Sequence, residues 1–159
     1  MAFAACILWF VGLSQAAESA SPERLAVGVN VIGGQLDYAP TRDWRVELRY
    51  VGGSQSSSGG TVSSQVMGLR GYRVFGAAPT RFYSGAEAAY VGAKQRGTDY
   101  RTTGTAIGAF IGLERRIARR LWIGIDAGPY VLALRESVSH ASSTNVEFVL
   151  NSYALLWVF

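Results

Sequence analysis

The histidine at position 140 lies two residues before a serine, and this pair could act in nucleophilic catalysis. In the stretch SVSHASS, His140 could take a proton from the hydroxyl of Ser142, which would then attack a substrate carbonyl. Glu147 or Glu136 would be the acid that orients the imidazole. The serine-rich surroundings favour a simpler interpretation, in which His140 is a solvated residue of a polar external loop. The sequence leaves both interpretations open.

Arginines form the densest cluster of charge, in the segment ERRIARR. The cluster consists of Arg115, Arg116, Arg119 and Arg120. These cations could bind lipid phosphates at a membrane surface, where each Lys or Arg contributes about 1 kcal/mol, or they could be solvated side chains at a turn between strands. A second group could contact the phosphates of lipopolysaccharide in the same way. It consists of Lys94, Arg96 and Arg101.

Other common chemistries find no support in the sequence. The single cysteine, Cys6, leaves no partner for an internal disulfide or for a cysteine-based zinc site. The glycine-rich stretches GGSQSSSGG and GTAIGAFIG lack the strand–turn–helix context of a nucleotide site. The net charge of +4 is modest, and the arginines form no basic stripe suited to nucleic acid. We therefore expect no cofactor, no metal and no nucleic-acid partner.

The first part of the chain has the pattern of an export signal. Residues 1–16 combine an apolar stretch with Ser14-Gln15-Ala16, a small–x–small cleavage site, although no Lys or Arg precedes the apolar run. Residues 17–23 form a short polar lead. We expect residues 24–159 to form a single domain of the exported protein.

Alternating apolar and polar residues predict β-strands almost throughout this domain. In the segment from Trp44 to Tyr50, large apolar residues alternate with charged ones, which is the mark of a strand with two different faces. Most of the expected strands exceed the roughly 5–6 residues of an average globular strand and reach the roughly 9–11 that cross a bilayer. The expected strands are 25–31, 44–50, 62–75, 80–94, 102–114, 120–135 and 145–159.

The connections and the strand number point to a barrel. Single-chain bacterial membrane barrels have an even number of strands, so an eighth must come from NVIGGQLDYAP, divided at Gly33-Gly34, or from an uncleaved segment, residues 2–13. Longer polar connections (52–61, 94–103, 135–144) alternate with shorter ones (75–80, 114–120). The prediction is an all-β protein, a closed antiparallel up-and-down transmembrane β-barrel of eight strands.

Charged side chains share one strand face with glycine and alanine, opposite the large apolar residues. In a narrow membrane barrel this face lines the lumen, where charges must pair because an unpaired buried ion costs several kcal/mol. The alternative is a soluble barrel of lipocalin type, in which the charged face meets water. The expected lumen network is Arg45, Glu47, Arg49, Arg70, Glu87 and Asp126.

The ending NSYALLWVF resembles the C-terminal signal of bacterial outer-membrane barrels, which finish on Phe with apolar or aromatic residues at alternate positions. The matching residues are Tyr153, Leu155, Trp157 and Phe159. In that family this strand is recognised by the barrel assembly machinery. The other face of the strand is then expected to meet the lumen, although it is unusually apolar for that place; it carries Phe148, Leu150, Ala154, Leu156 and Val158.

The layout of residues 24–159 is similar to the small OmpA-like and opacity-protein-like barrels, including the segments GAEAAYVGA and IGIDAGPYV. This resemblance implies a bacterial outer-membrane location, contact with lipid and lipopolysaccharide, and a structural or interaction role without catalysis. The His-Ala-Ser stretch also resembles the His-x-Ser pair of lipid A deacylases, which are barrel enzymes. That pair lies on a lipid-facing strand in the family, whereas here a loop is expected, so deacylation remains the alternative function.

Overall fold

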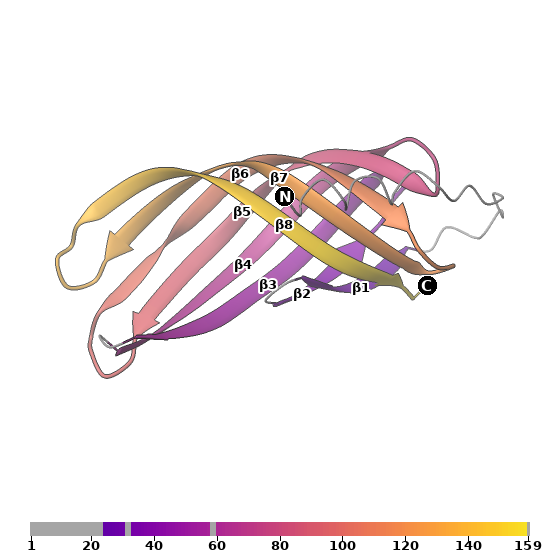
Figure 1. The fold of residues 1–159 in the computed structure, drawn as a ribbon. Coiled ribbons are helices and arrows are strands. Elements are labelled where there is room, and N and C mark those ends of the chain that lie inside the picture. Colours follow the sequence, from indigo (N-terminus) through magenta and orange to yellow (C-terminus); the bar gives the residue numbers. More distant parts are fainter. Residues whose placement is uncertain (1–23, 31–32, 58–59, 159) are drawn as a thin grey trace, which may run out of the picture.

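Eight antiparallel strands form a closed ring in the computed structural model (Figure 1), which describes residues 24–30, 33–57 and 60–158. Each strand pairs with its neighbours in sequence, and the first pairs with the last. The predicted all-β, up-and-down barrel is therefore confirmed. The expected signal peptide, the polar lead and Phe159 lie outside the described residues.

The strands follow the alternating segments of the sequence. Among the described residues, no helix is long and apolar enough to cross a bilayer. The strands are β1 (Leu25–Asn30), β2 (Gly33–Tyr38), β3 (Trp44–Ser57), β4 (Gly60–Phe75), β5 (Thr80–Gln95), β6 (Arg101–Arg116), β7 (Leu121–Glu136) and β8 (Ser142–Trp157).

The eighth strand arises from the region that contains Gly33-Gly34, but the division lies elsewhere than predicted. β1 ends at Asn30 and β2 begins at Gly33, so the two glycines open a strand and do not separate two strands. A side chain at Gly33 would meet backbone of β3, because a Cβ there would lie 1.9 Å from the carbonyl oxygen of Tyr50. The ring closes without residues 2–13, which lie outside the described residues.

The register defines an oblique ring of apolar residues around the barrel, which we call the apolar belt. Starting from Val146 and following paired residues through all eight strands, the path returns to β8 at Leu156, ten residues further along the chain. Such a stagger is what tilts the strands of a closed barrel. All members of the belt are exposed on the outer face. They are Val146, Val131, Ile107, Ala88, Leu69, Leu48, Leu36 and Val27.

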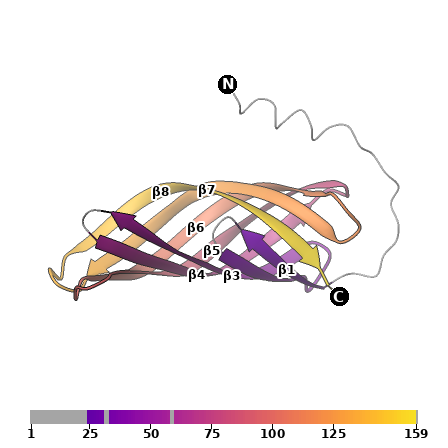
Figure 2. The ribbon, with the colours of Figure 1, turned by 60° about the horizontal axis from the view of Figure 1, so that its bottom comes forward.

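The ring is shorter on the side of β1 and β2 than elsewhere. These two strands have 6 residues each, whereas β4 to β8 have 16. β1 therefore pairs with β8 only from Tyr153 to Trp157. In the described part of the chain, the segment of β8 before Tyr153 is paired on the β7 side alone, and the long strands project beyond the short hairpin (Figure 2).

Two ends of the barrel can be distinguished. The base carries the tight turns 39–43, 76–79 and 117–120, and the loop end carries the turns 96–100 and 137–141. A cluster of buried aromatic and aliphatic side chains fills the base, among them Tyr72, Phe110, Trp122 and Trp157. The charged side chains of the lumen lie against and above this cluster.

Candidate functional site

Apolar side chains point outward and ionic side chains point inward. On β3, Trp44 and Leu48 are each 52% exposed, whereas the intervening Arg45 is 2% exposed. On β7, Ile125 is 45% exposed and its neighbour Asp126 is 4% exposed. A soluble barrel gains its stability from removing apolar surface from water, which requires the opposite arrangement. The lipocalin-like alternative is therefore wrong.

An arginine–carboxylate pair lies near the base of the lumen. Both terminal nitrogens of Arg45 donate to the carboxylate of Glu114, at 2.7 and 2.8 Å. Arg81, paired with Glu114 across β5 and β6, contacts the same carboxylate at 2.8 Å. The two guanidinium groups also lie over the rings of Trp157 and Trp122, at 4.7 and 3.8 Å from the ring centroids. The buried carboxylate of Glu114 therefore binds two guanidinium groups, and both of these groups contact tryptophan rings at the base.

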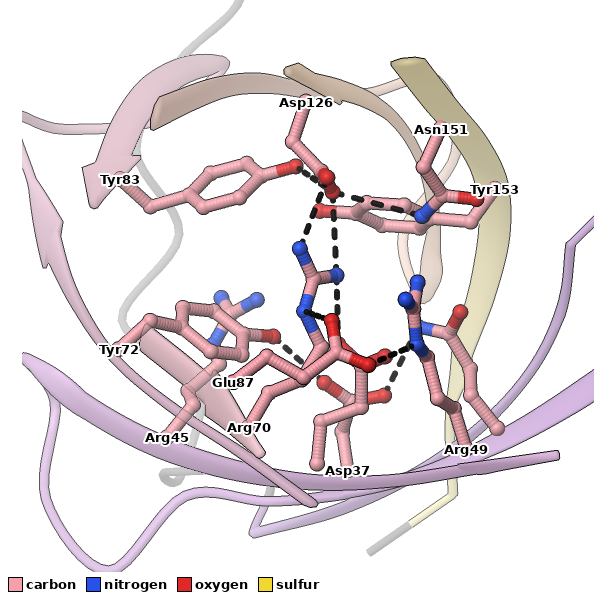
Figure 3. A network of polar contacts seen from close by, with 12 residues as sticks. Asp37, Arg45, Arg49, Arg70, Tyr72, Tyr83, Glu87, Asp126, Asn151 and Tyr153 are labelled. Carbon is pink, nitrogen blue, oxygen red and sulfur yellow. Dashed lines mark hydrogen bonds and ion pairs between the residues drawn. The ribbon is translucent and has the colours of Figure 1, made fainter. Parts of the chain in front are cut away.

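Arg70 occupies the centre of the network, where it contacts three carboxylates. Its two terminal nitrogens donate to Asp126 at 2.8 and 3.1 Å, and one of them reaches Glu47 at 3.4 Å. Its Nε lies 3.3 Å from Glu87. Figure 3 shows the side chain extending across the lumen from one wall toward Asp126 on the other. The guanidinium also stacks on Phe110, 3.6 Å from the ring centroid.

The upper end of the network is formed by Arg49, Glu87 and Tyr130. The Nε of Arg49 donates to one oxygen of Glu87 at 2.7 Å, and the hydroxyl of Tyr130 donates to the other at 2.7 Å. Above them the inner wall becomes apolar, with Val91 and Leu132 packed near Tyr130. The polar network thus occupies the middle of the barrel.

Asp37 accepts its hydrogen bonds from neutral groups. The hydroxyl of Tyr72 and the amide of Gln35 donate to its two oxygens. With Asp37 counted, the described network has five carboxyl groups and four guanidinium groups. The acids are Asp37, Glu47, Glu87, Glu114 and Asp126, and the bases are Arg45, Arg49, Arg70 and Arg81.

Four inward tyrosines each pack against a glycine on a neighbouring strand. A Cβ added at Gly112 would lie 2.2 Å from the ring of Tyr83, and one at Gly124 would lie 2.3 Å from the ring of Tyr153. The other two pairs are Tyr130 with Gly108 and Tyr72 with Gly85. Aromatic residues commonly cover glycines across strands in this way. The inward glycines therefore leave room for the rings that carry the hydroxyl donors.

All six residues of the expected lumen network lie inside the barrel and contact opposite charges. Sequence reasoning left out Asp37, Arg81 and Glu114, and it assigned no role to the four tyrosines. The alternation of apolar and polar residues could have identified Asp37 and the tyrosines as inward residues, because they lie on the same strand faces as the charged side chains. The alternation along residues 102–114 also places Glu114 on the face that carries the glycines, but its partner Arg45 lies three strands away.

The last strand has its faces reversed relative to the prediction. Tyr153, Leu155 and Trp157 point inward and are buried, whereas Phe148 and Leu156 are 75% and 50% exposed on the outside. The face that was expected to line the lumen is therefore the outer face of the barrel. The prediction failed because both faces of this strand are apolar, so alternation alone could not tell them apart.

The structure does not bring the candidate catalytic residues together. His140 is exposed in the turn between β7 and β8, at a positive φ of 55°. Ser142 and Glu147 are five residues apart on β8, so the alternation of the strand places them on opposite faces. The carboxylate of Glu136 accepts hydrogen bonds from Tyr100 and Ser139, at 2.7 and 2.6 Å. Within the described ranges, no cluster of acidic, His or Cys side chains could hold a metal.

The two groups of basic residues lie at opposite ends of the barrel. Arg119 and Arg120 are exposed in a turn at the base, and Arg116 at the end of β6 is partly buried. Arg115 is only 8% exposed, which leaves little of its side chain for a lipid phosphate. At the loop end, Lys94 and Arg101 are exposed and directly opposite each other on β5 and β6, and Arg96 is exposed in the adjoining turn.

Comparison with known proteins supports the fold. No protein-family model and no curated protein sequence matches the chain. Among solved structures, Neisserial surface protein A is 16% identical over 84% of this chain and 92% of its own, with a TM-score of 0.57. CarO of Acinetobacter baumannii is 14% identical over 86% of this chain and 96% of its own, with a TM-score of 0.35. The resemblance to small eight-stranded outer-membrane barrels is thus confirmed at the level of the fold.

Proposed function

We propose that the chain is an integral protein of a bacterial outer membrane, with a structural or lipid- and partner-binding role. Its lumen is closed by ion pairs, so it does not conduct solutes larger than ions. Catalysis is not part of the proposed role. The observation that carries this proposal is the inversion of polarity, in which the apolar belt surrounds a charged interior.

Hydrocarbon is the solvent that suits this outer wall. Exposed apolar residues on every strand would cost about 25 cal/mol for each Å² left in water, whereas they are at no disadvantage in lipid. In hydrocarbon, backbone amides must be bonded within the protein, and a closed ring of strands meets this condition where each strand is paired on both sides. In the described chain the segment of β8 before Tyr153 is the exception, because its β1 side has no paired strand. The belt residues Leu48, Leu69 and Ile107 lie on β3, β4 and β6 and are each more than half exposed.

The ion pairs support the proposal that the lumen is closed. Arg70 contacts acids on β3, β5 and β7, so its side chain crosses the interior from β4. Below it, the pair of Arg45 and Glu114 spans the lumen against the buried rings of the base. A solute would have to break several buried charge contacts to pass, each costly to separate.

Fractionation tests the location. After expression in a Gram-negative host, we expect the chain to remain in membranes washed with alkaline carbonate and to migrate faster on gels when unheated than when boiled. Recovery of the folded chain in the soluble periplasmic fraction would contradict the proposal. In planar bilayers, the refolded protein should show no passage of sugars, with a general porin as the positive control.

Acylation of lipid A tests the alternative function. Expression of the chain should leave the acyl chains of lipid A unchanged in mass spectra, for the native protein and for Ser142→Ala alike. Loss of an acyl chain with the native protein, but not with Ser142→Ala, would establish a deacylase and refute the absence of catalysis.

A further inference from the structure

The outer wall changes from apolar to polar above the belt on strands β3 to β6. The register places Tyr50, Met67 and Tyr90 side by side in the next row toward the loop end. The row above them consists of Gly52, Gln65, Gly92 and Thr103. The row above that consists of Ser54, Ser63, Lys94 and Arg101. Tyrosine followed by polar residues is typical of the boundary between hydrocarbon and headgroups.

A groove of about 780 Å³ lies on this part of the wall. Of the two glycines between the tyrosines below and the cations above, Gly92 leaves room for a Cβ, whereas a Cβ at Gly52 would lie 2.9 Å from the hydroxyl of Tyr50. A Cβ at Gly92 would meet Tyr90 at 3.4 Å and Gln65 at 3.5 Å, which are ordinary contact distances, so a larger side chain could occupy the groove there. Hydroxyl and amide groups line the remainder, from Ser54, Ser63, Gln65 and Thr103.

Two cations border the groove without a described acidic partner. Lys94 and Arg101 are paired residues on β5 and β6, so their side chains leave the same face of the sheet close together. Like charges directly opposite each other destabilise a strand pair. In the described part of the chain neither side chain forms an ion pair with a carboxylate. A bound anion between them would remove this repulsion.

We propose that this groove binds the phosphorylated sugar headgroup of an outer-leaflet glycolipid. The inference rests on the proposed outer-membrane location. Lys94 and Arg101 contact the phosphate, and the hydroxyl and amide groups of the rows below bind the sugar. The volume exceeds what a single phosphate needs, and the lining offers hydrogen-bond donors and acceptors suited to sugar hydroxyls. The tyrosines mark the level at which the acyl chains begin.

The test measures binding to the full chain refolded in micelles of an uncharged detergent. The probes are purified lipid A, its dephosphorylated form, phosphatidylglycerol and inorganic phosphate. The first variant, Lys94→Gln/Arg101→Gln, removes the cations. The second, Gly92→Val, fills the groove and keeps both charges. The control, Arg24→Gln/Arg42→Gln, removes two exposed cations at the base and has the same net charge as the first variant.

We expect the native chain and the control to prefer phosphorylated lipid A over the other three probes. The cation variant should bind lipid A about tenfold more weakly or worse, since each cation contributes roughly 1 kcal/mol near an anionic surface. Gly92→Val should lower the affinity for lipid A as well, which a purely electrostatic attraction would not predict.

Three outcomes would overturn the inference: equal affinity of the native chain and the cation variant for lipid A, an equal loss in the control, or equal binding of phosphatidylglycerol. Heat-modifiable migration of each variant reports that the barrel has folded. Retention in carbonate-washed membranes is measured separately. A chain that stays in the membrane but shows no preference for lipid A refutes this inference alone, whereas a chain that leaves the membrane refutes the proposed function.

Discussion

Arg45 and Glu114 join opposite walls of the barrel through two parallel hydrogen bonds of 2.7 and 2.8 Å, although they lie 69 residues apart in the sequence. Both side chains are almost fully buried, at 2% and 0% exposure. A buried pair of this kind contributes little relative to a well-packed apolar pair, but losing one partner leaves an uncompensated charge. The pair therefore fixes how the strands are arranged in the lower lumen.

Replacement of Glu114 by glutamine should destabilise the barrel strongly. It leaves the charges of both Arg45 and Arg81 without their carboxylate, and breaking a buried pair costs about 3–5 kcal/mol. Urea titration of the protein refolded in lipid vesicles, followed by tryptophan fluorescence, measures this change. The double variant Arg45→Met/Glu114→Gln should recover part of the loss. A single variant as stable as the native chain would contradict the ion-pair assignment.

Replacement of Arg70 by methionine should be more harmful than the same change at Arg49. Methionine keeps contact with Phe110 but removes the ion-pair partner of three acids, whereas among the described residues Arg49 forms an ion pair with Glu87 alone. We expect a loss of several kcal/mol for Arg70→Met and a smaller loss for Arg49→Met, in the same urea titration. Equal losses would show that the contacts of Arg70 with Glu47 and Asp126 contribute nothing.

Lysine in the apolar belt should be costly only if that belt lies in hydrocarbon. Ile107→Lys should lower the free energy of unfolding by about 2–4 kcal/mol in lipid vesicles, whereas Thr144→Lys, nearer the loop end, should cost about 0–1 kcal/mol. Both positions are exposed on the outer face, so a water-soluble barrel would tolerate the two changes equally. Equal stability of the two variants would argue against a membrane-embedded belt.

A side chain at Gly112 should interfere with the ring of Tyr83. Gly112→Val places a Cβ where the ring now lies, and overpacking of this kind costs about 1–3 kcal/mol. Tyr83→Ala in the same chain should relieve part of the cost, which a double-mutant cycle of unfolding free energies would measure as favourable coupling. Gly71→Val is the control, because a Cβ at Gly71 meets nothing within 4 Å. Additive effects at Gly112 and Tyr83 would mean that the ring does not need the space.

Alternation predicted the strands where their two faces differ in chemistry. β3 carries apolar residues on one face and charged residues on the other, so its sequence defines both the strand and its orientation. On β7 the inward face combines Asp126 and glycines with the rings of Trp122 and Tyr130. The barrel class followed from strand length. The predicted alternation of long and short connections is wrong, because the polar segments 52–57, 101–103 and 142–144 extend the strands and the described turns at both ends have four or five residues. The position of β2 was harder to predict, because Gly33 and Gly34 suggest a turn in the sequence although they begin a strand in the structure.

The pairing within the lumen could not be predicted, because it depends on the stagger between strands. The sequence shows which charges share the inward face, but the tilt of the barrel decides which of them meet. Glu114 lies inside beside Arg45 only because the offsets of three intervening strand pairs add up to that position. The same limit applies to the outer groove, whose rows combine residues from four strands.

The short strand β1 pairs with only the last five residues of β8, which carry residues of the predicted assembly signal. Tyr153, Leu155 and Trp157, the residues expected to be read during assembly, pair with Asn30, Gly28 and Ala26 and turn toward the interior once the ring is complete. If these residues are the assembly signal, they are accessible to a factor only before the ring has closed, because the closed ring buries all three side chains.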